Sequence, residues 1–291
     1  MPKENPERDC PKRVFDRVDC PRFPSESSSA WTVSEKDMPV SVRARPCSSV
    51  SPPLITLTTD FGQSDPYVAA MKGVIRAICP YAAIDDLSHD IPPQDLTATT
   101  LFVAGAAPYF PPDSIHVIVV DPGVGTERHA ILAQAGNQYF ICPDNGLLTV
   151  FLQAHPVENA WRIDNPVLMR PVVSATFHGR DIFAPAAAHL AYGRAPHEFG
   201  QALDALVTLD IPTAQKQLDG SIHGEVIHID HFGNCITNIP RALLDTGTEY
   251  RVECTAVSLD RIAETYGAVA PGAPLALFGS TDHLEIAVRN G

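Results

Sequence analysis

The 291-residue chain lacks the features that would place it in a membrane, on nucleic acid or in a disulfide framework. No stretch approaches the roughly 18 apolar residues that a membrane-spanning helix needs. Its 21 Lys and Arg stand against 34 Asp and Glu, and a net charge of −13 argues against broad nucleic-acid binding. The seven cysteines form no CxxC pair, so no thiolate zinc site is indicated and a reducing cytoplasm is the expected location.

The first 53 residues differ in composition from the rest of the chain. They contain nine prolines, a serine run at 27–29 and no apolar periodicity. Such a segment buries too little apolar surface to fold, so we expect a disordered N-terminal extension over 1–53. Its eight acidic residues argue against an organellar transit peptide, and no apolar core of a secretory signal is present.

From Leu54 onward, strand and helix patterns alternate. Apolar, β-branched runs predict strands at 54–59, 83–86, 116–120 and 139–141, with helices between the first three and again at 181–190. This alternation predicts an α/β domain with a largely parallel sheet over 54–208. Asp60 and Asp121 directly follow two of these strands, at the sheet edge where ligands bind in such folds.

The C-terminal part has a different pattern. After a weakly patterned linker over 209–222, short alternating runs at 225–229, 235–239, 250–254, 275–278 and 284–288 predict strands with few helices. We therefore expect a smaller all-β, barrel-like domain over 223–291.

Asp121 and Arg128 bracket a Gly-rich turn, Asp-Pro-Gly-Val-Gly-Thr-Glu-Arg. Such a turn can hold phosphate through backbone N–H groups, but the Lys of a phosphate-binding loop is missing. The alternative is an ordinary turn carrying a surface Asp–Arg pair.

A second cluster, Phe177-His178-Gly179-Arg180-Asp181, is typical of an active-site loop, because His titrates near neutral pH and Asp or Arg can fix its tautomer. Two alternatives are open. Asp181 can be a helix N-cap beside a core His178, or the two can bind a metal with His129 or His89, although no metal-ligand spacing supports this.

A third cluster, Asp230-His231-Phe232-Gly233-Asn234, lies in the predicted β domain. Its polar side chains flank a glycine, and the alternative to a binding role is an ordinary Asx-type turn.

Eight motifs in one order resemble the S-adenosylmethionine (SAM) hydroxide adenosyltransferases, which are SAM hydrolases related to the bacterial fluorinase and chlorinase. The resemblance covers about residues 54–291 and outweighs the structural alternatives for the three clusters. It is carried by Thr59-Asp-Phe-Gly62, Asp65-Pro-Tyr-Val68, Met71-Lys-Gly73, Ile91-Pro-Pro-Gln-Asp95, Asp121-Pro-Gly-Val-Gly125, Asn145-Gly-Leu-Leu148, Phe177-His-Gly-Arg-Asp181 and Asp230-His-Phe-Gly-Asn234.

The resemblance implies a homotrimer that binds SAM between the N-terminal domain of one subunit and the C-terminal domain of the next. It implies attack of water or hydroxide on the ribose C5′ of SAM, which yields adenosine and L-methionine without a metal or other cofactor. It also implies further chain after Gly291, so we expect the β domain to lack its final strand.

The resemblance assigns a catalytic triad to Asp121, Arg128 and His178. The halogenating relatives have Tyr-Ser in place of His178-Gly179 and Tyr in place of Asp121, so this chain is expected to use water. Asp121 and His178 are both candidates for the group that takes the proton of water, because coupled groups titrate as a unit.

The resemblance also assigns the substrate contacts. Asp60 would bind the ribose hydroxyls, and Phe177 and Phe232 would line the adenosine and sulfonium region. Asp230 and Asn234 would bind the methionine amino group and nearby polar atoms. Asp65, Gln94 and Ser280 match further contact positions. For Asp65, a helix N-cap is the competing role, and Gln94 replaces a Trp of the halogenases.

Three other functions are weighed against the hydrolase. A SAM-dependent halogenase would turn over with halide but not with water. A non-catalytic SAM or adenosine binder would bind SAM without releasing adenosine. A phosphate-loop hydrolase is disfavoured because no Lys follows the glycines.

Overall fold

The computed structural model describes residues 51–255 and 257–291. All but the last three residues of the extension predicted over 1–53 lie outside the described part of the chain.

The N-terminal domain is built on a six-stranded sheet with strand order β2-β1-β3-β5-β4-β6. The first four strands in this order are parallel, and β4 runs antiparallel to both of its neighbours. The elements are β1 (Leu54–Thr59), α1 (Tyr67–Ile78), β2 (Ala83–Ser88), α2 (Leu96–Ala106), β3 (Ile115–Val119), β4 (Ala130–Ala135), β5 (Gln138–Pro143), α3 (Thr149–Ala154), β6 (Val157–Arg162) and α4 (Ala184–Tyr192). The predicted α/β class with a largely parallel sheet is confirmed.

Short helical turns complete this domain. The 3₁₀ turns are η1 (Ala107–Tyr109), η2 (Pro166–Leu168) and η4 (Pro196–Phe199), and η3 (Gly179–Phe183) is a π-helix that runs directly into α4.

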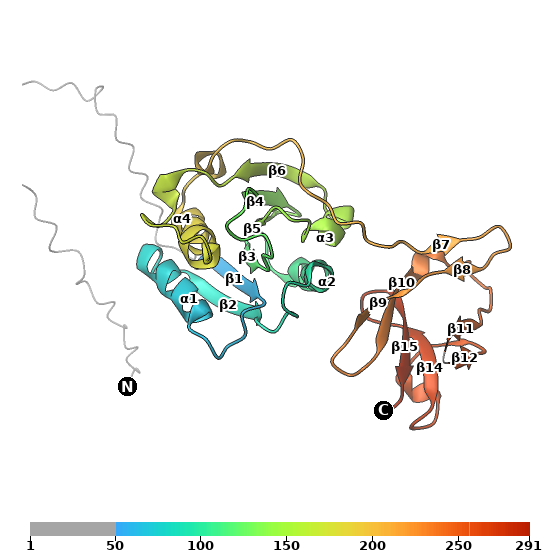
Figure 1. Ribbon diagram of the computed structural model, residues 1–291. Coiled ribbons are helices and arrows are strands. Elements are labelled where there is room, and N and C mark those ends of the chain that lie inside the picture. The colour runs from blue at the N-terminus through green and yellow to red at the C-terminus, as the bar shows by residue number, and fades with distance from the viewer. Residues whose placement is uncertain (1–50, 256) are drawn as a thin grey trace, which may run out of the picture. The chain divides into compact units, whose positions relative to one another are not determined.

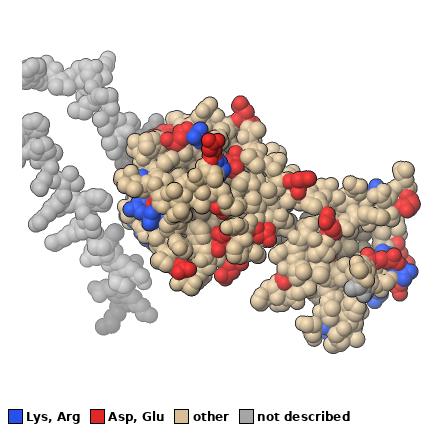
Figure 2. All heavy atoms as spheres, viewed as in Figure 1, with Lys and Arg blue, Asp and Glu red and all other residues tan. Residues whose placement is uncertain are grey.

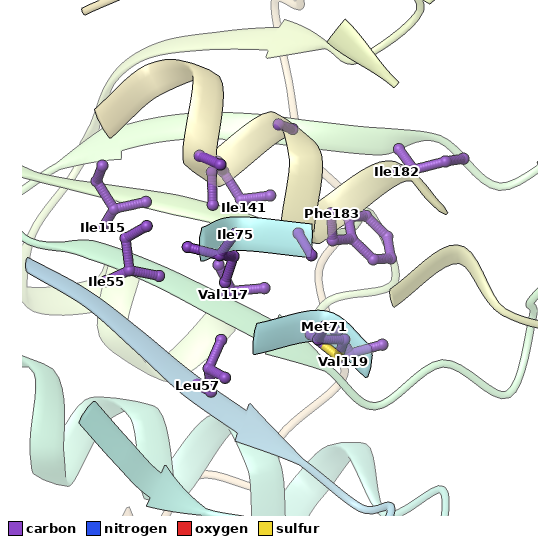
Figure 3. Packing of buried hydrophobic residues seen from close by; sticks show 14 of the residues in the cluster. Ile55, Leu57, Met71, Ile75, Ile115, Val117, Val119, Ile141, Ile182 and Phe183 are labelled. Atoms are coloured by element: carbon purple, nitrogen blue, oxygen red, sulfur yellow. The ribbon is translucent and has the colours of Figure 1, made fainter. Parts of the chain in front are cut away.

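Helices cover both faces of the sheet, α1 and α4 on one and α2 and α3 on the other (Figure 1). Alternate residues of β3 point to opposite faces. Val117 and Val119 pack with Met71 and Phe183 on the α1–α4 side (Figure 3), whereas Ile118 belongs to the other core. Because β3 is buried on both faces, it carries the continuous apolar run seen in the sequence.

Two helix N-caps were expected from the sequence, and the structure confirms one of them. Asp95 caps α2, accepting a hydrogen bond from Ala98 N–H at 2.8 Å. The N-cap of α1 is Pro66, without a side-chain hydrogen bond, so the cap role considered for Asp65 is wrong. Asp65 lies exposed in the loop before that helix.

The C-terminal domain is rich in antiparallel strands, which confirms the second half of the predicted fold class. Its main sheet has the order β13-β14-β15-β10-β9, antiparallel except for the β13–β14 pair. Two small hairpins, β7–β8 and β11–β12, accompany it. The strands are β7 (Gln215–Lys216), β8 (Ile222–His223), β9 (Val226–Ile229), β10 (Cys235–Pro240), β11 (Val252–Cys254), β12 (Val257–Leu259), β13 (Ile262–Ala263), β14 (Pro274–Phe278) and β15 (His283–Val288), with 3₁₀ turns η5 (Arg241–Leu243) and η6 (Tyr266–Ala268).

The surface reflects the acidic composition. On the face shown in Figure 2, Asp and Glu side chains are spread widely, and Lys and Arg lie in small groups. Among the described helices, none is both long and apolar enough to cross a membrane.

The residue boundaries predicted for the domains and linker stay a prediction.

Candidate active site

Asp121 and Arg128 meet in the loop after β3. Arg128 Nε donates to both Asp121 carboxylate oxygens, at 2.9 and 3.0 Å, and its Nη2 donates to Oδ2 as well. The two side chains are only 5% and 10% exposed, so this is a largely buried ion pair and not the surface pair of the alternative interpretation. The fixed fork of the guanidinium locks the carboxylate in one orientation.

Arg128 also binds the third member of the predicted triad. Its Nη2 lies 2.7 Å from His178 Nδ1. A guanidinium can only donate, so Nδ1 accepts and the neutral ring carries its proton on Nε2. Burial and the Arg128 charge lower the pKa of His178 below its usual value, so the ring is neutral at pH 7. His178 therefore offers an Nε2–H donor.

The loop before His178 is held by Asp181, which is fully buried in η3. Its carboxylate accepts from Arg180 Nε and Nη2 at 2.7 and 2.8 Å, from Ser174 N–H at 2.9 Å and from Arg170 Nη1 at 3.3 Å. Burial alone would raise the pKa of Asp181, but the hydrogen bonds from Arg180 and Ser174 and the two arginine charges lower it.

These contacts correct both alternatives for this cluster. Asp181 lies inside the π-helix and is not an N-cap, and its oxygens face two arginines where a metal would have to bind. The described residues contain no group of three or more His, Cys, Asp or Glu side chains able to hold a metal ion.

The loop from Asp121 to Arg128 packs closely at Gly125 against the segment that precedes His178. The Gly125 φ of +78° is in the left-handed region, and a Cβ there would collide with the Ala175 carbonyl oxygen. The glycine allows the Asp121–Arg128 loop to lie directly against the segment that leads to His178.

Asp60 follows β1, and its Oδ2 accepts a hydrogen bond from the Gln94 backbone N–H at 2.8 Å. Gln94 itself has a φ of 61°, an uncommon conformation for a residue with a side chain. The exposed Gln94 thus reaches Asp60 through its backbone.

Phe177 belongs to a cluster of three aromatic rings. Its centroid lies 5.9 Å from that of Phe61 and 5.2 Å from that of Tyr67, both edge-on, and the Arg180 guanidinium lies 5.0 Å from its centroid. Tyr67 lies within the Asp65-Pro-Tyr-Val68 motif, but its residue type alone gave no signal for a place in this cluster.

The predicted contacts of the C-terminal domain centre on Asp230. Its Oδ1 accepts from the backbone N–H groups of Phe232 and Asn234, and its Oδ2 accepts from Asn234 Nδ2 at 2.8 Å. The Asx-type turn considered as an alternative is therefore present, and Asp230 builds it. Phe232 is 81% exposed, and Ser280 is exposed in the loop between β14 and β15.

Family models match two long segments of the chain. The N-terminal domain of the SAM hydroxide adenosyltransferases matches residues 55–200, and their C-terminal domain matches residues 224–291. The chain belongs to this family.

Named relatives of the family include both hydrolases and fluorinases. The chain is 41% identical to an (R)-S-adenosyl-L-methionine hydrolase of Thermus thermophilus over 241 residues, 80% of this chain and 91% of the relative. It is 29% identical to a fluorinase of an Actinoplanes species over 69% of this chain and 76% of the relative. A crystal structure of a conserved Thermotoga maritima protein superimposes with a TM-score of 0.75 at 38% identity, covering 81% of this chain and 93% of that one.

Proposed function

We propose that this protein hydrolyses SAM to adenosine and L-methionine. The observation that carries the proposal is the chain of hydrogen bonds from Asp121 through Arg128 to His178, in a chain 41% identical to a SAM hydrolase. In the reaction, a water oxygen bonds to the ribose C5′ as the C5′–S bond breaks. The electron pair stays on sulfur, and one proton is released.

The hydrogen-bond directions divide the work between the triad members. His178 Nδ1 already accepts from Arg128, and its Nε2 carries a proton, so the neutral ring can orient water by donation but has no free lone pair. We infer that Asp121 accepts the proton of water. Arg128 holds both groups and stabilises developing hydroxide.

The leaving group explains why this modest machinery suffices. A sulfonium departs as a neutral thioether, so in-line positioning of water is the main requirement. We propose that neither a metal nor a redox cofactor takes part.

The substrate contacts are part of the same proposal. Asp60, held by Gln94, would bind the ribose diol, and Phe177 with its neighbouring rings would face the sulfonium region. Asp230, Phe232, Asn234 and Ser280 would supply the contacts from the C-terminal domain, and Asp65 would reach the methionine end.

We further propose a homotrimer with the site between subunits. In the single chain, Phe232 is 81% and Ile229 61% exposed, and a neighbouring subunit with bound substrate would cover such apolar side chains. Sedimentation velocity should give three times the mass of one chain, and a monomer at assay concentrations would contradict the trimer.

A chromatographic assay with SAM in halide-free buffer tests the activity. We expect adenosine and methionine to appear in equal amounts and in molar excess over protein. Product formation only after chloride or fluoride is added would instead indicate a halogenase, and bound SAM without product would indicate a binding protein.

A further inference from the structure

Four side chains of the C-terminal domain form a hydrogen-bonded line that includes two carboxylates. Asn234 Nδ2 donates to Asp230 Oδ2 at 2.8 Å and to the Tyr266 hydroxyl at 3.4 Å. Tyr266 donates in turn to Glu285 Oε2 at 2.9 Å. Glu285 is 6% exposed, and no Lys, Arg or His of residues 51–255 and 257–291 pairs with it.

Glu285 is difficult to explain by stability alone. It lies in β15 beside the buried Leu284 and close to the buried Ala287. A buried carboxylate without a cation is costly, and replacing such groups with apolar ones of similar size is often neutral or stabilising. The position points to a role for the carboxylate as a hydrogen-bond acceptor.

The direction of each hydrogen bond in this line is fixed by chemistry. The Tyr266 hydroxyl has a single proton, which it donates to Glu285, so its oxygen accepts from Asn234. Desolvation and the Glu285 and Asp230 carboxylates raise the pKa of Tyr266 to about 12, so the hydroxyl keeps that proton at neutral pH.

The consequence falls on Asn234. Both hydrogens of its Nδ2 are committed, one to Asp230 and one to Tyr266, so the carboxamide cannot rotate without losing both contacts. Among the described residues, no group hydrogen-bonds to the Asn234 Oδ1. This oxygen is also absent from the polar atoms of these residues that are both unpaired and completely buried, so a ligand can reach it. The line therefore presents one oriented acceptor to a ligand.

We propose that Glu285 is a positioning residue that acts through Tyr266 to hold Asn234 Oδ1 as the acceptor for an N–H donor of the substrate. The inference rests on the proposed function, because SAM carries two such donors, the 6-amino group of adenine and the ammonium group of the methionine half.

Steady-state kinetics of four variants tests this role. Glu285→Met removes the acceptor at similar size, Tyr266→Phe removes the relay, and Glu285→Gln keeps a carbonyl acceptor. We expect the first two to raise the KM for SAM about five- to ten-fold, the value of one or two hydrogen bonds, with kcat little changed. Glu285→Gln should stay near wild type, and the double variant Glu285→Met/Tyr266→Phe should be no worse than either single change.

Two surface changes in the same domain serve as matched controls. Glu253→Met and Tyr250→Phe alter an exposed Glu and a Tyr hydroxyl that lie outside the line, and both should leave KM unchanged. Gly279→Ala provides an independent perturbation. A Cβ there would overlap the Glu285 carboxylate, so this variant should reproduce the KM of Glu285→Met without altering any group in the line.

Calorimetry with the products identifies the donor. If the 6-amino group binds Asn234, Glu285→Met weakens adenosine binding but not inosine binding, because inosine has a carbonyl there. If the ammonium group binds, the same variant weakens L-methionine binding alone. Unchanged KM and product binding in Glu285→Met and Tyr266→Phe would overturn the positioning role, as would an equal loss in Glu285→Gln.

Failure of the proposed function has a different signature. A wild-type chain that releases no adenosine from SAM overturns the hydrolase, and the product-binding measurements then decide the role of Glu285 alone. Failure of the wild-type chain to bind SAM or either product would overturn both.

Discussion

At the scale of single residues, the direction of one hydrogen bond decides how the proposed triad would work. His178 accepts from Arg128 and so displays a proton at Nε2, and Asp121 is the remaining acceptor. A side chain that donates from the same place but cannot act as a base should therefore replace the imidazole in part.

We expect His178→Gln to retain clearly more activity than His178→Ala, because the carboxamide still supplies an N–H donor. Asp121→Asn should lower kcat by about 10²- to 10⁴-fold, the usual contribution of a general base. The measurement is kcat and KM by chromatography of adenosine. Equal losses in His178→Gln and His178→Ala would contradict the donor role.

Gln94 offers a second test at this scale, because its strained backbone contacts Asp60. A glycine at this position would hold a φ of 61° without strain, whereas a β-branched residue costs about 1–2 kcal/mol there. We expect Gln94→Gly to keep the KM for SAM and Gln94→Val to raise it. A large rise in Gln94→Gly would show that the side chain itself binds substrate.

At the scale of elements, the site depends on how two loops pack. Gly125 and Gly193 both have left-handed backbones, with φ of +78° and +108°, but only Gly125 has a neighbour where its Cβ would stand. Comparing the two separates backbone strain from collision between the loops.

We expect Gly193→Ala to cost about 1 kcal/mol of unfolding free energy through strain and to leave kcat unchanged. Gly125→Ala should cost more and also lower kcat, because it forces the Asp121–Arg128 loop away from the loop of His178. Urea unfolding together with kinetics measures both effects. Equal behaviour of the two variants would show that the loops move apart without consequence.

The strands show how much of the fold could be predicted from the sequence. The strands β1 and β3 are predictable because burial on both faces demands continuous apolar, β-branched runs. By contrast, β4 is rich in Ala and β6 is largely polar and exposed, so neither has a strand-like pattern. The competing helix-cap role for Asp65 is wrong because an Asp-Pro pair is typical of a helix start, yet Pro66 itself occupies the cap.

The site, like the fold, was predictable only where the signal lies in a short stretch of sequence. The resemblance assigned a triad to Asp121, Arg128 and His178, and the structure places these three side chains in contact. Tyr266 and Glu285 were not predicted because their contact depends on how the 3₁₀ turn η6 packs against β15. The only sequence signal was a single acidic residue within the apolar run of β15.

At the scale of the whole molecule, a buried histidine links stability to pH. His116 lies in β3, 1% exposed, stacked on Phe140 with a centroid distance of 5.0 Å. Burial lowers its pKa to about 4. The unfolded chain, with a His pKa of about 6.5, therefore binds the proton first as pH falls.

The stability of the folded chain therefore decreases as pH falls. The stabilisation is fully present above about pH 6.5 and is lost as pH falls toward 4, about 2 kcal/mol of it between pH 7 and 5. His178 and His189 have pKa values lowered by burial and add to the same trend. Urea unfolding at pH 7 and 5 should show the loss. His116→Asn should reduce the pH dependence by about 2 kcal/mol. An unchanged pH dependence in this variant would contradict the role of His116.

Gly179, next to His178, has a consequence for redesign and evolution. A Cβ at this position would lie 3.2 Å from Met71 Sδ, 3.3 Å from Phe177 and 3.4 Å from Phe61. Met71 is a fully buried member of the core. The His178-Gly179 pair, which the resemblance predicts to differ in the halogenating relatives, thus lies against the hydrophobic interior. Any exchange of this pair that adds a side chain at position 179 must therefore also move Met71 or one of the two phenylalanines by a few tenths of an ångström, so a change of nucleophile at this position carries a cost in core packing.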